Sequence, residues 1–309
     1  MKISIVIPTY NESENIIEIS KDIEKIFSKL KYDYEQIIID NSSTDGTIQI
    51  IKNLAKENKN IKVIINSRNY GHIRSPFYGI LQSSGDATIF MAADYQDPPE
   101  LIYEYIKLWE QGKKVILAKK KSSNENRFIF NIRKIFYRIL DKISDHKLTI
   151  DTTGAGLYDK SIISHLNNIR DPYPYFRGLI SELTNEISFV EFAQPLRKYG
   201  ITKNNFFSLY DLGMLGIVKN SRAPLRFMTL VGFISSLISL FIGIFYFFYK
   251  LFFWETFSLG LAPVIIGIFF ISSIQIVLLG LMGEYIGVIL LHQRNMPLVI
   301  EKERINFDN

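Results

Sequence analysis

The sequence predicts an α/β domain followed by amphipathic juxtamembrane helices and a two-helix hairpin that spans a membrane. Two observations predict this architecture: apolar, β-branched runs alternate with helical stripes over residues 1–118, and two long stretches near the C-terminus carry no charge. The 309 residues include 36 Lys and Arg, 31 Asp and Glu, and no Cys. The net charge of +5 is too small to indicate a nucleic-acid partner, and the lack of Cys excludes a disulfide scaffold and a thiol nucleophile.

Strand and helix signals alternate along the first part of the chain. An Ile- and Val-rich run over residues 2–7 is typical of a buried strand. Asn11 and Glu14 have capping-box spacing, and apolar residues from Ile16 to Leu30 then keep a helical period. This alternation indicates βαβ units and a parallel sheet. We further expect strands at 36–39, 61–65, 87–91 and 114–118, and helices at 47–56, 75–83 and 99–111.

Polar clusters follow four of the predicted strands. Because ligands bind beyond the carboxyl ends of parallel strands, we expect these clusters to form one site. Within them, Asp94 and Gln96 are separated by one residue and can offer oxygen to one hard cation. A Gly-x-Gly-x-x-Gly run after the first strand and a Gly-Lys-Ser/Thr loop are both absent, which disfavours Rossmann dinucleotide binding and P-loop hydrolysis. The clusters are residues 8–12, 40–45, 68–72 and 94–97.

The two charge-free runs occupy residues 227–249 and 256–283. At about 1.5 Å per residue, each is long enough to cross a hydrocarbon core of about 30 Å. A buried hairpin of a soluble protein is the alternative. Basic residues gather at the outer ends while the link holds Lys250 alone, so the positive-inside rule places the N-terminal region and the tail in the cytoplasm. The outer basic residues are Lys219, Arg222, Arg226, His292, Arg294, Lys302 and Arg304.

The polar motifs resemble those of family-2 glycosyltransferases with the GT-A fold. They are residues 6–12 (Val-Ile-Pro-Thr-Tyr-Asn-Glu), 40–47 (Asp-Asn-Ser-Ser-Thr-Asp-Gly-Thr), 68–71 (Arg-Asn-Tyr-Gly) and 94–100 (Asp-Tyr-Gln-Asp-Pro-Pro-Glu). The resemblance extends to one subgroup of this family through residues 197–203 (Arg-Lys-Tyr-Gly-Ile-Thr-Lys), residues 280–287 and the two spans. They are similar to the polyisoprenyl-phosphate glycosyltransferases, the group that contains bactoprenol glucosyltransferases and dolichol-phosphate mannose synthases.

This resemblance implies inverting transfer of a sugar from a nucleotide-diphosphate sugar to a membrane polyprenyl phosphate. The product would be a lipid-linked monosaccharide for cell-envelope glycan synthesis or modification. The resemblance also implies a divalent cation, Mg²⁺ or Mn²⁺, at Asp94 and Gln96. An acceptor phosphate is already anionic, so it needs orientation and charge screening more than deprotonation. The residues assigned to donor binding are Pro8, Tyr10, Glu12, Asp40, Arg68, Asn69, Gly71, Asp94, Arg197 and Lys203.

The sequence departs from the family pattern at two positions. The usual Asp-x-Asp-x-Gln cluster has Ala92 in place of its first carboxylate, so the cation has one anionic ligand fewer. Ala155 stands where many relatives carry an Asp in a Gly-Asp-Phe segment. The catalytic base therefore stays open between Asp151 and Asp97. The expected catalytic residues are Asp94, Asp97, Asp151, Arg197 and Lys203.

Some of these residues also have simpler interpretations. Glu12 could favour the dipole of the first helix, and Arg68 and Asn69 could hold loop backbone rather than ligand. Asp45 with Gly46 is expected to form only a turn.

The resemblance and the hydropathy pattern together predict the domain organisation. We expect a multi-pass protein of the inner or plasma membrane, with its catalytic domain and both termini in the cytoplasm. A basic amphipathic helix over residues 127–143 suits an anionic leaflet and equally suits packing on its own domain. The expected parts are a GT-A domain (1–204), a juxtamembrane segment (205–226), a hairpin (227–283, with spans of about 227–249 and 257–283) and a tail (284–309).

Two other functions stay open. A processive polysaccharide synthase would carry Gln-x-x-Arg-Trp and more spans, whereas Lys198 follows Arg197 here. A non-catalytic donor-binding or assembly subunit would suit Ala92 and Ala155. The sequence identifies neither the sugar nor the nucleotide, the prenyl length or the metal, and it leaves a homo-oligomer open.

Overall fold

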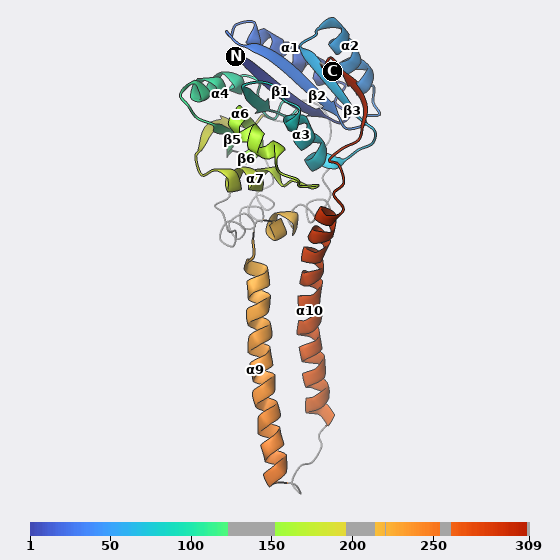
Figure 1. The fold of residues 1–309 in the computed structure, drawn as a ribbon, viewed down its shortest axis with the longest axis vertical. Coiled ribbons are helices and arrows are strands. Elements are labelled where there is room, and N and C mark those ends of the chain that lie inside the picture. Colours follow the sequence, from blue (N-terminus) through green and yellow to red (C-terminus); the bar gives the residue numbers. More distant parts are fainter. Residues whose placement is uncertain (123–151, 196–213, 220, 254–260, 308–309) are drawn as a thin grey trace.

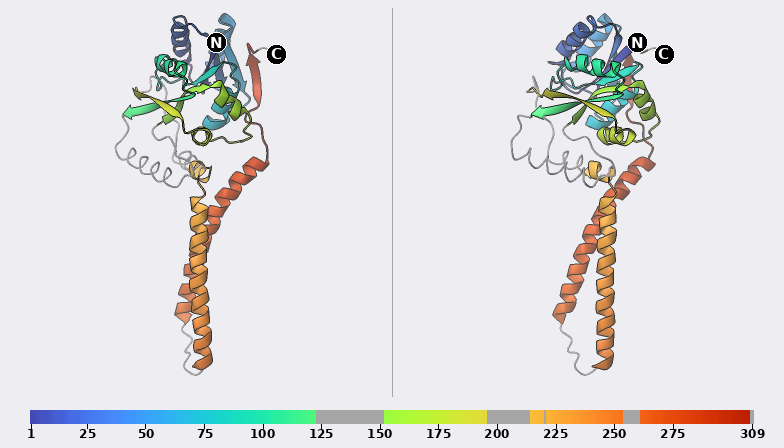
Figure 2. Two further views of the ribbon diagram at one scale, coloured as in Figure 1. Left: turned by 60° about the vertical axis from the view of Figure 1, so that its left-hand side comes forward. Right: turned by 90° about the vertical axis from the view of Figure 1, so that its left-hand side faces the viewer.

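The computed structural model describes residues 1–122, 152–195, 214–219, 221–253 and 261–307. In this part of the chain, an α/β domain carries a hairpin of two long helices that extends away from it (Figure 1, Figure 2). Several predicted features fall outside the described residues: the helix at 127–143, Asp151, Arg197 and Lys203.

The described strands form one eight-stranded mixed sheet in the order β7-β5-β6-β4-β1-β2-β3-β8. The first four strands run parallel to one another, whereas β6 is antiparallel to β4 and β5, and β8 is antiparallel to β3. The bounds are β1 (Lys2–Thr9), β2 (Asp33–Asp40), β3 (Ile61–Asn66), β4 (Ala87–Phe90), β5 (Val115–Ser122), β6 (Thr152–Asp159), β7 (Ile187–Ala193) and β8 (Glu301–Ile305).

Helices cover both faces of this sheet. Ile5 and Val6 are neighbours on β1 and are both fully buried, but they belong to different core clusters. Ile5 packs on the side of α1, α2 and α4, and Val6 packs on the side of α3, α6 and α7. Two covered faces require an unbroken apolar strand, because side chains alternate along it. The helices are α1 (Ile16–Phe27), α2 (Thr47–Glu57), α3 (Gly71–Leu81), α4 (Leu101–Glu110), α6 (Lys160–Asn167) and α7 (Phe176–Leu183).

The predicted alternation of strands and helices is confirmed, with small differences at the ends. The helix expected from residue 75 begins at Gly71. Pro76 consequently lies inside α3, where it cannot donate to the carbonyl of His72.

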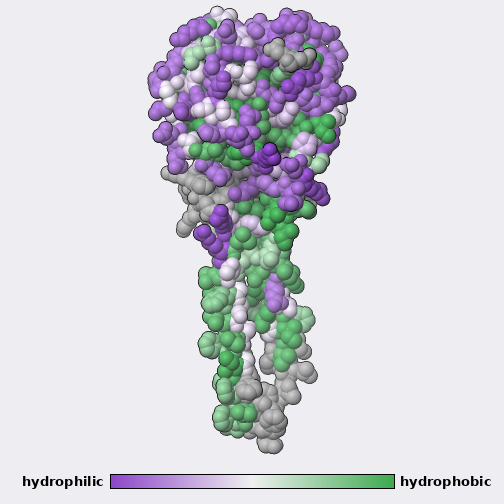
Figure 3. All heavy atoms as spheres, viewed as in Figure 1, coloured by the Kyte–Doolittle hydropathy of each residue, from purple (hydrophilic) through white to green (hydrophobic). Residues whose placement is uncertain are grey.

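The hairpin consists of α9 (Ala223–Phe252) and α10 (Leu261–Gln293). The stretches long and apolar enough to cross a membrane are Ala223–Phe245 and Gly267–Gln293, and only 6% and 0% of their most apolar windows are buried. The structure therefore does not pack them into the core of the domain, and Figure 3 shows their apolar surface exposed below a mainly hydrophilic domain. The second helix continues ten residues beyond the expected end at 283, to Gln293.

Polar contacts join the hairpin to the α/β domain at the end of the hairpin that is nearest the domain. Lys219 donates to both carboxylate oxygens of Asp171, at 2.7 and 2.6 Å, and His292 at the end of α10 lies 3.3 Å from the same carboxylate. The hydroxyl of Tyr285 donates to the carbonyl of Ser221 at 3.0 Å, which links the two helices at this end. Two of the basic residues that flank the predicted spans thus hold the domain over the hairpin.

After α10 the chain returns to the sheet as β8, which pairs with β3 (Figure 1). Lys52 on α2 forms an ion pair with Glu303, and the amide of Asn306 donates to the carbonyls of Ala55 and Ile61 at 2.6 and 2.8 Å. The sequence predicts only a tail here, with no strand in it. Its pattern of charges, Glu-Lys-Glu-Arg-Ile, suits an exposed edge strand, but β3 lies more than two hundred residues earlier in the chain.

Candidate active site

The carboxyl ends of β1, β2, β3 and β4 meet at one edge of the sheet, as predicted. Thr9 at the end of β1 lies in register with Asp40 at the end of β2, and Asp40 lies in register with Ile65 near the end of β3. On the other side of β1, Val6 pairs with Phe90, where β4 ends. The four motif loops therefore leave the sheet next to one another.

Asp40 is fully buried at this edge. Its carboxylate accepts hydrogen bonds from the backbone N–H of Ser43 at 2.8 Å, from the Ser43 hydroxyl, and from the Thr9 hydroxyl at 3.3 Å. Burial raises the pKa of the Asp40 carboxyl, and these neutral donors offset only part of that effect. Asp40 thus organises the loop after β2 in this structure, and its contact with a donor nucleotide stays a prediction.

The loop after β1 is fastened to the loop after β2. The backbone N–H of Asn11, a residue with φ of +56°, donates to the Ser43 hydroxyl at 2.8 Å. In return, the N–H of Thr44 donates to the Asn11 side chain at 2.8 Å. Asp45 does more than form the expected turn, since it accepts from the backbone N–H groups of Ser13 and Thr47. These crossed hydrogen bonds hold the two motif loops as one unit.

The predicted donor residues of the first loop lie on this unit. Pro8 is half-buried at the end of β1, and Tyr10 and Glu12 follow it and are partly exposed. The carboxylate of Glu12 accepts from the Asn15 amide at 2.7 Å, just before α1 begins. The backbone N–H of Glu12 donates to the Thr47 hydroxyl at 3.0 Å.

Asn41 connects the loops after β2 and β3, a role that the sequence analysis missed. Its amide oxygen accepts from the backbone N–H of Tyr70 at 2.8 Å and from the amide of Asn66 at 3.2 Å. Its amide nitrogen donates to the side chain of Asn69 at 2.9 Å and to the carbonyl of Gly71 at 3.1 Å. The Asn69 side chain in turn accepts from the backbone N–H of Gly71 at 2.8 Å, so it holds loop backbone in this structure, and its contact with a donor nucleotide stays a prediction. The sequence pattern that could have indicated this role is the presence of three Asn residues at the ends of adjacent parallel strands.

Asp94, Gln96 and Asp97 form the loop after β4. Asp94 is 9% exposed and Asp97 is 4% exposed. Asp94 accepts from the backbone N–H of Gln96 at 3.1 Å. Tyr95 between them has φ of +61°, and its hydroxyl donates to Asp22 on α1 at 2.7 Å. The left-handed turn thus directs Tyr95 towards α1.

The donor set of this loop fits a hard cation only in part. One carboxylate and one amide oxygen are suitable ligands for Mg²⁺ or Mn²⁺, which take about six oxygens. Among the described residues, no group of three or more His, Asp or Glu side chains could hold a metal ion. Asp94 and Gln96 would therefore fill only a minority of the positions around such a cation.

One further residue at this edge, Arg177, comes from outside the predicted motifs. Arg177 on α7 lies near His72 at the start of α3, and burial together with this cation lowers the pKa of His72. The Cγ atom of Arg177 also lies 3.8 Å from the place that a Cβ atom on Gly154 would occupy. Arg177 thus brings a cation to this edge of the sheet. The sequence predicts Arg197 and Lys203 as the source of positive charge there.

Ala155 on β6 is 2% exposed and belongs to the core cluster that also holds Ala93 and Ala118. The neighbouring Gly156 leaves no room for a side chain, since an added Cβ atom would lie 2.1 Å from the carbonyl oxygen of Ile116. Gly156 is therefore needed for the pairing of β5 with β6.

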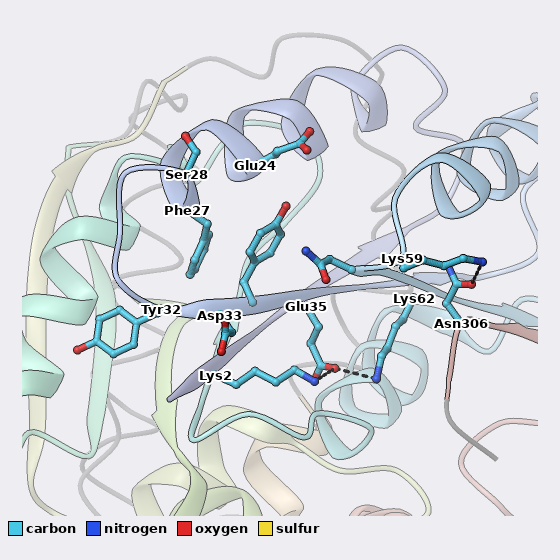
Figure 4. Close-up of a pocket in the computed structure, with 12 residues that line it drawn as sticks. Lys2, Glu24, Phe27, Ser28, Tyr32, Asp33, Glu35, Lys59, Lys62 and Asn306 are labelled. Atoms are coloured by element: carbon cyan, nitrogen blue, oxygen red, sulfur yellow. Dashed lines mark hydrogen bonds and ion pairs between the residues drawn. The ribbon is translucent and has the colours of Figure 1, made fainter.

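A pocket of about 590 Å³ opens at the opposite, amino-terminal edge of the sheet (Figure 4). Its cations Lys2 and Lys62 both point at the buried carboxylate of Glu35, at 2.6 and 2.9 Å (Figure 4). Glu35 engages both of these lysines, and Glu24 and Asp33 add further carboxylates to the lining, so the pocket does not present its cations freely to an anionic ligand.

Comparisons with known proteins agree with the arrangement of these loops. Residues 4–166 match the family described as Glycosyl transferase family 2. The chain is 31% identical to the uncharacterized glycosyltransferase YkcC of Bacillus subtilis (strain 168), covering 99% of this chain and 95% of the relative. It is also 31% identical to the bactoprenol glucosyl transferase of Shigella phage SfII, covering 98% of each protein.

A solved structure supports the fold. Glucosyl-3-phosphoglycerate synthase from Mycobacterium tuberculosis, crystallised with phosphoglyceric acid, superposes with a TM-score of 0.50 at 17% identity, covering 70% of this chain and 77% of that one. The predicted GT-A type of α/β sheet is therefore confirmed. This chain belongs to glycosyl transferase family 2 and is a glycosyltransferase.

Proposed function

We propose that this glycosyltransferase moves a sugar, with inversion, from a nucleotide-diphosphate sugar to a polyprenyl phosphate on the cytoplasmic face of a membrane. The observation that carries the proposal is the convergence of four motif loops on a domain whose chain continues into two exposed apolar helices. The bactoprenol glucosyl transferases, which resemble the chain over nearly its full length, support a polyprenyl acceptor and make glucose the first sugar to test. The product would be a lipid-linked monosaccharide for the cell envelope.

The pairing of β8 with β3 supports the expected topology of the hairpin. Because the segment after α10 is part of the sheet, the N-terminal domain and the C-terminal segment lie on the same side of any membrane that the hairpin crosses. We infer that this side is the cytoplasm, since Arg222, Arg226 and Arg294 flank the spans there, and Lys250 is the single Lys or Arg of the link between the runs.

The chemistry requires orientation and charge neutralisation at the motif edge. When bound, a divalent cation would neutralise the charge that develops on the leaving diphosphate. Asp94 and Gln96 would orient the diphosphate, and Arg177, with Arg197 and Lys203 from the family pattern, would add positive charge beside it. Attack by the acceptor phosphate from the opposite face of the sugar then gives inversion.

This reaction explains how the site can work with Ala155 in place of the family carboxylate. A polyprenyl phosphate is already ionised at neutral pH, so no proton has to be removed before its oxygen attacks the anomeric carbon. The site then has to position the two reactants and to screen the charge that develops on the diphosphate. We keep Asp97 and Asp151 as the candidates for any residual role of a base.

The proposal is tested by supplying the purified full-length protein with candidate nucleotide sugars, a divalent ion and polyprenyl phosphate. We expect a lipid-linked monosaccharide, and its formation should stop when the divalent ion is chelated. A long polymer would instead identify a processive synthase, and donor binding without turnover would identify a non-catalytic subunit.

Asp94→Asn tests the site itself. Loss of the carboxylate removes the anionic ligand of the cation, so we expect turnover to fall by about 100-fold or more without a change in the melting temperature. Glu104→Gln on α4, where the carboxylate is exposed, is the matched control and should keep full activity. Wild-type turnover in Asp94→Asn would show that the metal ligand is assigned wrongly.

A further inference from the structure

A pocket of about 330 Å³ lies between the start of α3 and the end of α10. Three arginines line it: Arg68 and Arg74 from the domain, and Arg294 from the segment that follows α10. Tyr70 and Tyr173 also line it, and its remaining wall is apolar. We call this site the arginine pocket. Arg68 belongs to a predicted donor motif, but Arg74 and the residues after α10 have no part in the proposed transfer.

The positive charge of the arginine pocket is concentrated around one tyrosine ring, and the part that Arg74 carries is fixed in place. The guanidinium groups of Arg68 and Arg74 lie 4.2 and 5.1 Å from the centroid of the same Tyr70 ring. Arg74 is held there by donating to the backbone carbonyls of Pro297 and Leu298, at 2.6 and 2.8 Å. Burial and the charge of Arg68 lower the pKa of Arg74, as expected when like charges are brought together.

Carboxylates do not balance this charge in the part of the chain that the structure describes. None of the three arginines forms an ion pair there with an Asp or a Glu. Asp171, which is next to Pro172 of the pocket wall, is engaged by Lys219. The pocket therefore differs from the amino-terminal one, where Lys2 and Lys62 are paired with Glu35, and it is suited to an anion that binds forked guanidinium groups.

The position of the arginine pocket points to a lipid. Arg294 follows directly after Gln293, the last residue of the candidate span of α10, so the pocket lies at the height of the headgroups if the hairpin crosses a bilayer. Leu291 and Met296, which line the same pocket, are 43% and 56% exposed. Guanidinium groups beside exposed apolar side chains match a phosphate attached to acyl chains better than they match free phosphate.

A phosphate in this pocket would be too far from the motif edge at Asp94 to be the attacking one. Arg68 follows the end of β3 and Asp94 follows the end of β4, and the sheet order places these strands three spacings apart. At about 4.8 Å for each spacing, the separation is about 14 Å, whereas reacting atoms must approach to about 3 Å.

We infer that the arginine pocket binds the phosphate of an anionic glycerophospholipid and so fixes the domain over the bilayer. The inference depends on the membrane insertion in the proposed function, but not on the reaction. The chain that leaves α10 forms one wall of the pocket and then continues into β8. A lipid bound there would therefore contact both the membrane hairpin and the sheet.

The test uses the full-length protein in detergent with added phosphatidylglycerol or phosphatidylcholine, and native mass spectrometry counts the lipids that stay bound. We expect retention of phosphatidylglycerol to exceed that of phosphatidylcholine by about tenfold. Arg294→Gln should remove most of this preference, whereas Lys59→Gln at the opposite edge of the sheet should keep it.

A second pair of variants changes only charge at an exposed position. Met296→Glu should repel the headgroup phosphate and lower phosphatidylglycerol retention, and Met296→Gln should not. Equal retention of the two lipids by the wild type, or an unchanged preference in both Arg294→Gln and Met296→Glu, would overturn the inference. Displacement of the lipid by millimolar inorganic phosphate would also overturn it, in favour of a free-phosphate site. A protein that binds phosphatidylglycerol but transfers no sugar would count against the proposed function alone.

Discussion

The two edges of the sheet each bury a carboxylate, but they treat its charge in opposite ways. Glu35 at the amino-terminal edge contacts Lys2 and Lys62 (Figure 4), and these contacts, with a hydrogen bond from Ser4, overcome the effect of burial and lower its pKa to about 2. Asp40 at the carboxyl edge has hydroxyl and amide donors instead, and burial raises its pKa. One edge thus pairs its buried carboxylate with cations in a structural cluster, whereas at the other edge neutral donors of the motif loops hold the buried carboxylate.

Glu35→Gln should have the largest effect on stability of the changes considered for this comparison. It leaves two ammonium groups facing a neutral amide, and we expect the free energy of unfolding to fall by about 3 kcal/mol, measured by denaturant titration. Glu104→Gln, in an exposed pair with Lys107, should change it by about 0.5 kcal/mol at most. Wild-type stability in Glu35→Gln would show that the amino-terminal edge is not a structural cluster.

Acid should distinguish the two carboxylates. The folded-state pKa of Glu35, about 2, lies below its ordinary value of 4.5, so its contribution to stability is complete above pH 4.5 and is lost as the pH falls towards 2. The folded-state pKa of Asp40 is raised, so its buried charge lowers the stability of the folded protein. This unfavourable contribution should disappear as Asp40 takes up a proton on acidification. Unfolding titrations should therefore show a shallower acid loss of stability in Glu35→Gln and a steeper one in Asp40→Asn than in the wild type. The same loss of stability at acid pH in all three proteins would contradict the comparison.

Asn41→Ala should have a smaller effect, confined to the carboxyl edge. The backbone N–H of Tyr70 and the side chain of Asn69 would lose their partner, which costs about 1–3 kcal/mol of stability. We also expect weaker binding of the nucleotide sugar, measured by calorimetry, because the loops after β2 and β3 lose their link. Asn53→Ala on the exposed side of α2 is the control. Unchanged donor affinity would mean that this link does not shape the site.

Much of the carboxyl edge was predictable from the chain. Ile- and Val-rich runs and helical stripes predict where strands and helices lie, and polar motifs after the runs predict which edge carries the site. Asn41 and Arg177 were missed for different reasons. Asn41 acts through hydrogen bonds between loops of neighbouring strands, and Arg177 reaches the edge from a helix that follows the antiparallel strand β6.

The α/β alternation, the motif loops and the two apolar helices follow from the chain alone, because each depends on a short-range period or an unbroken run. The folded structure was needed to show that β8 joins β3, that Glu35 lies between Lys2 and Lys62, and that the end of α10 meets Arg68 and Arg74. Each of these contacts joins residues on different strands or helices. In the sequence, these charged residues resemble ordinary surface residues, because their partners come close only in the folded chain.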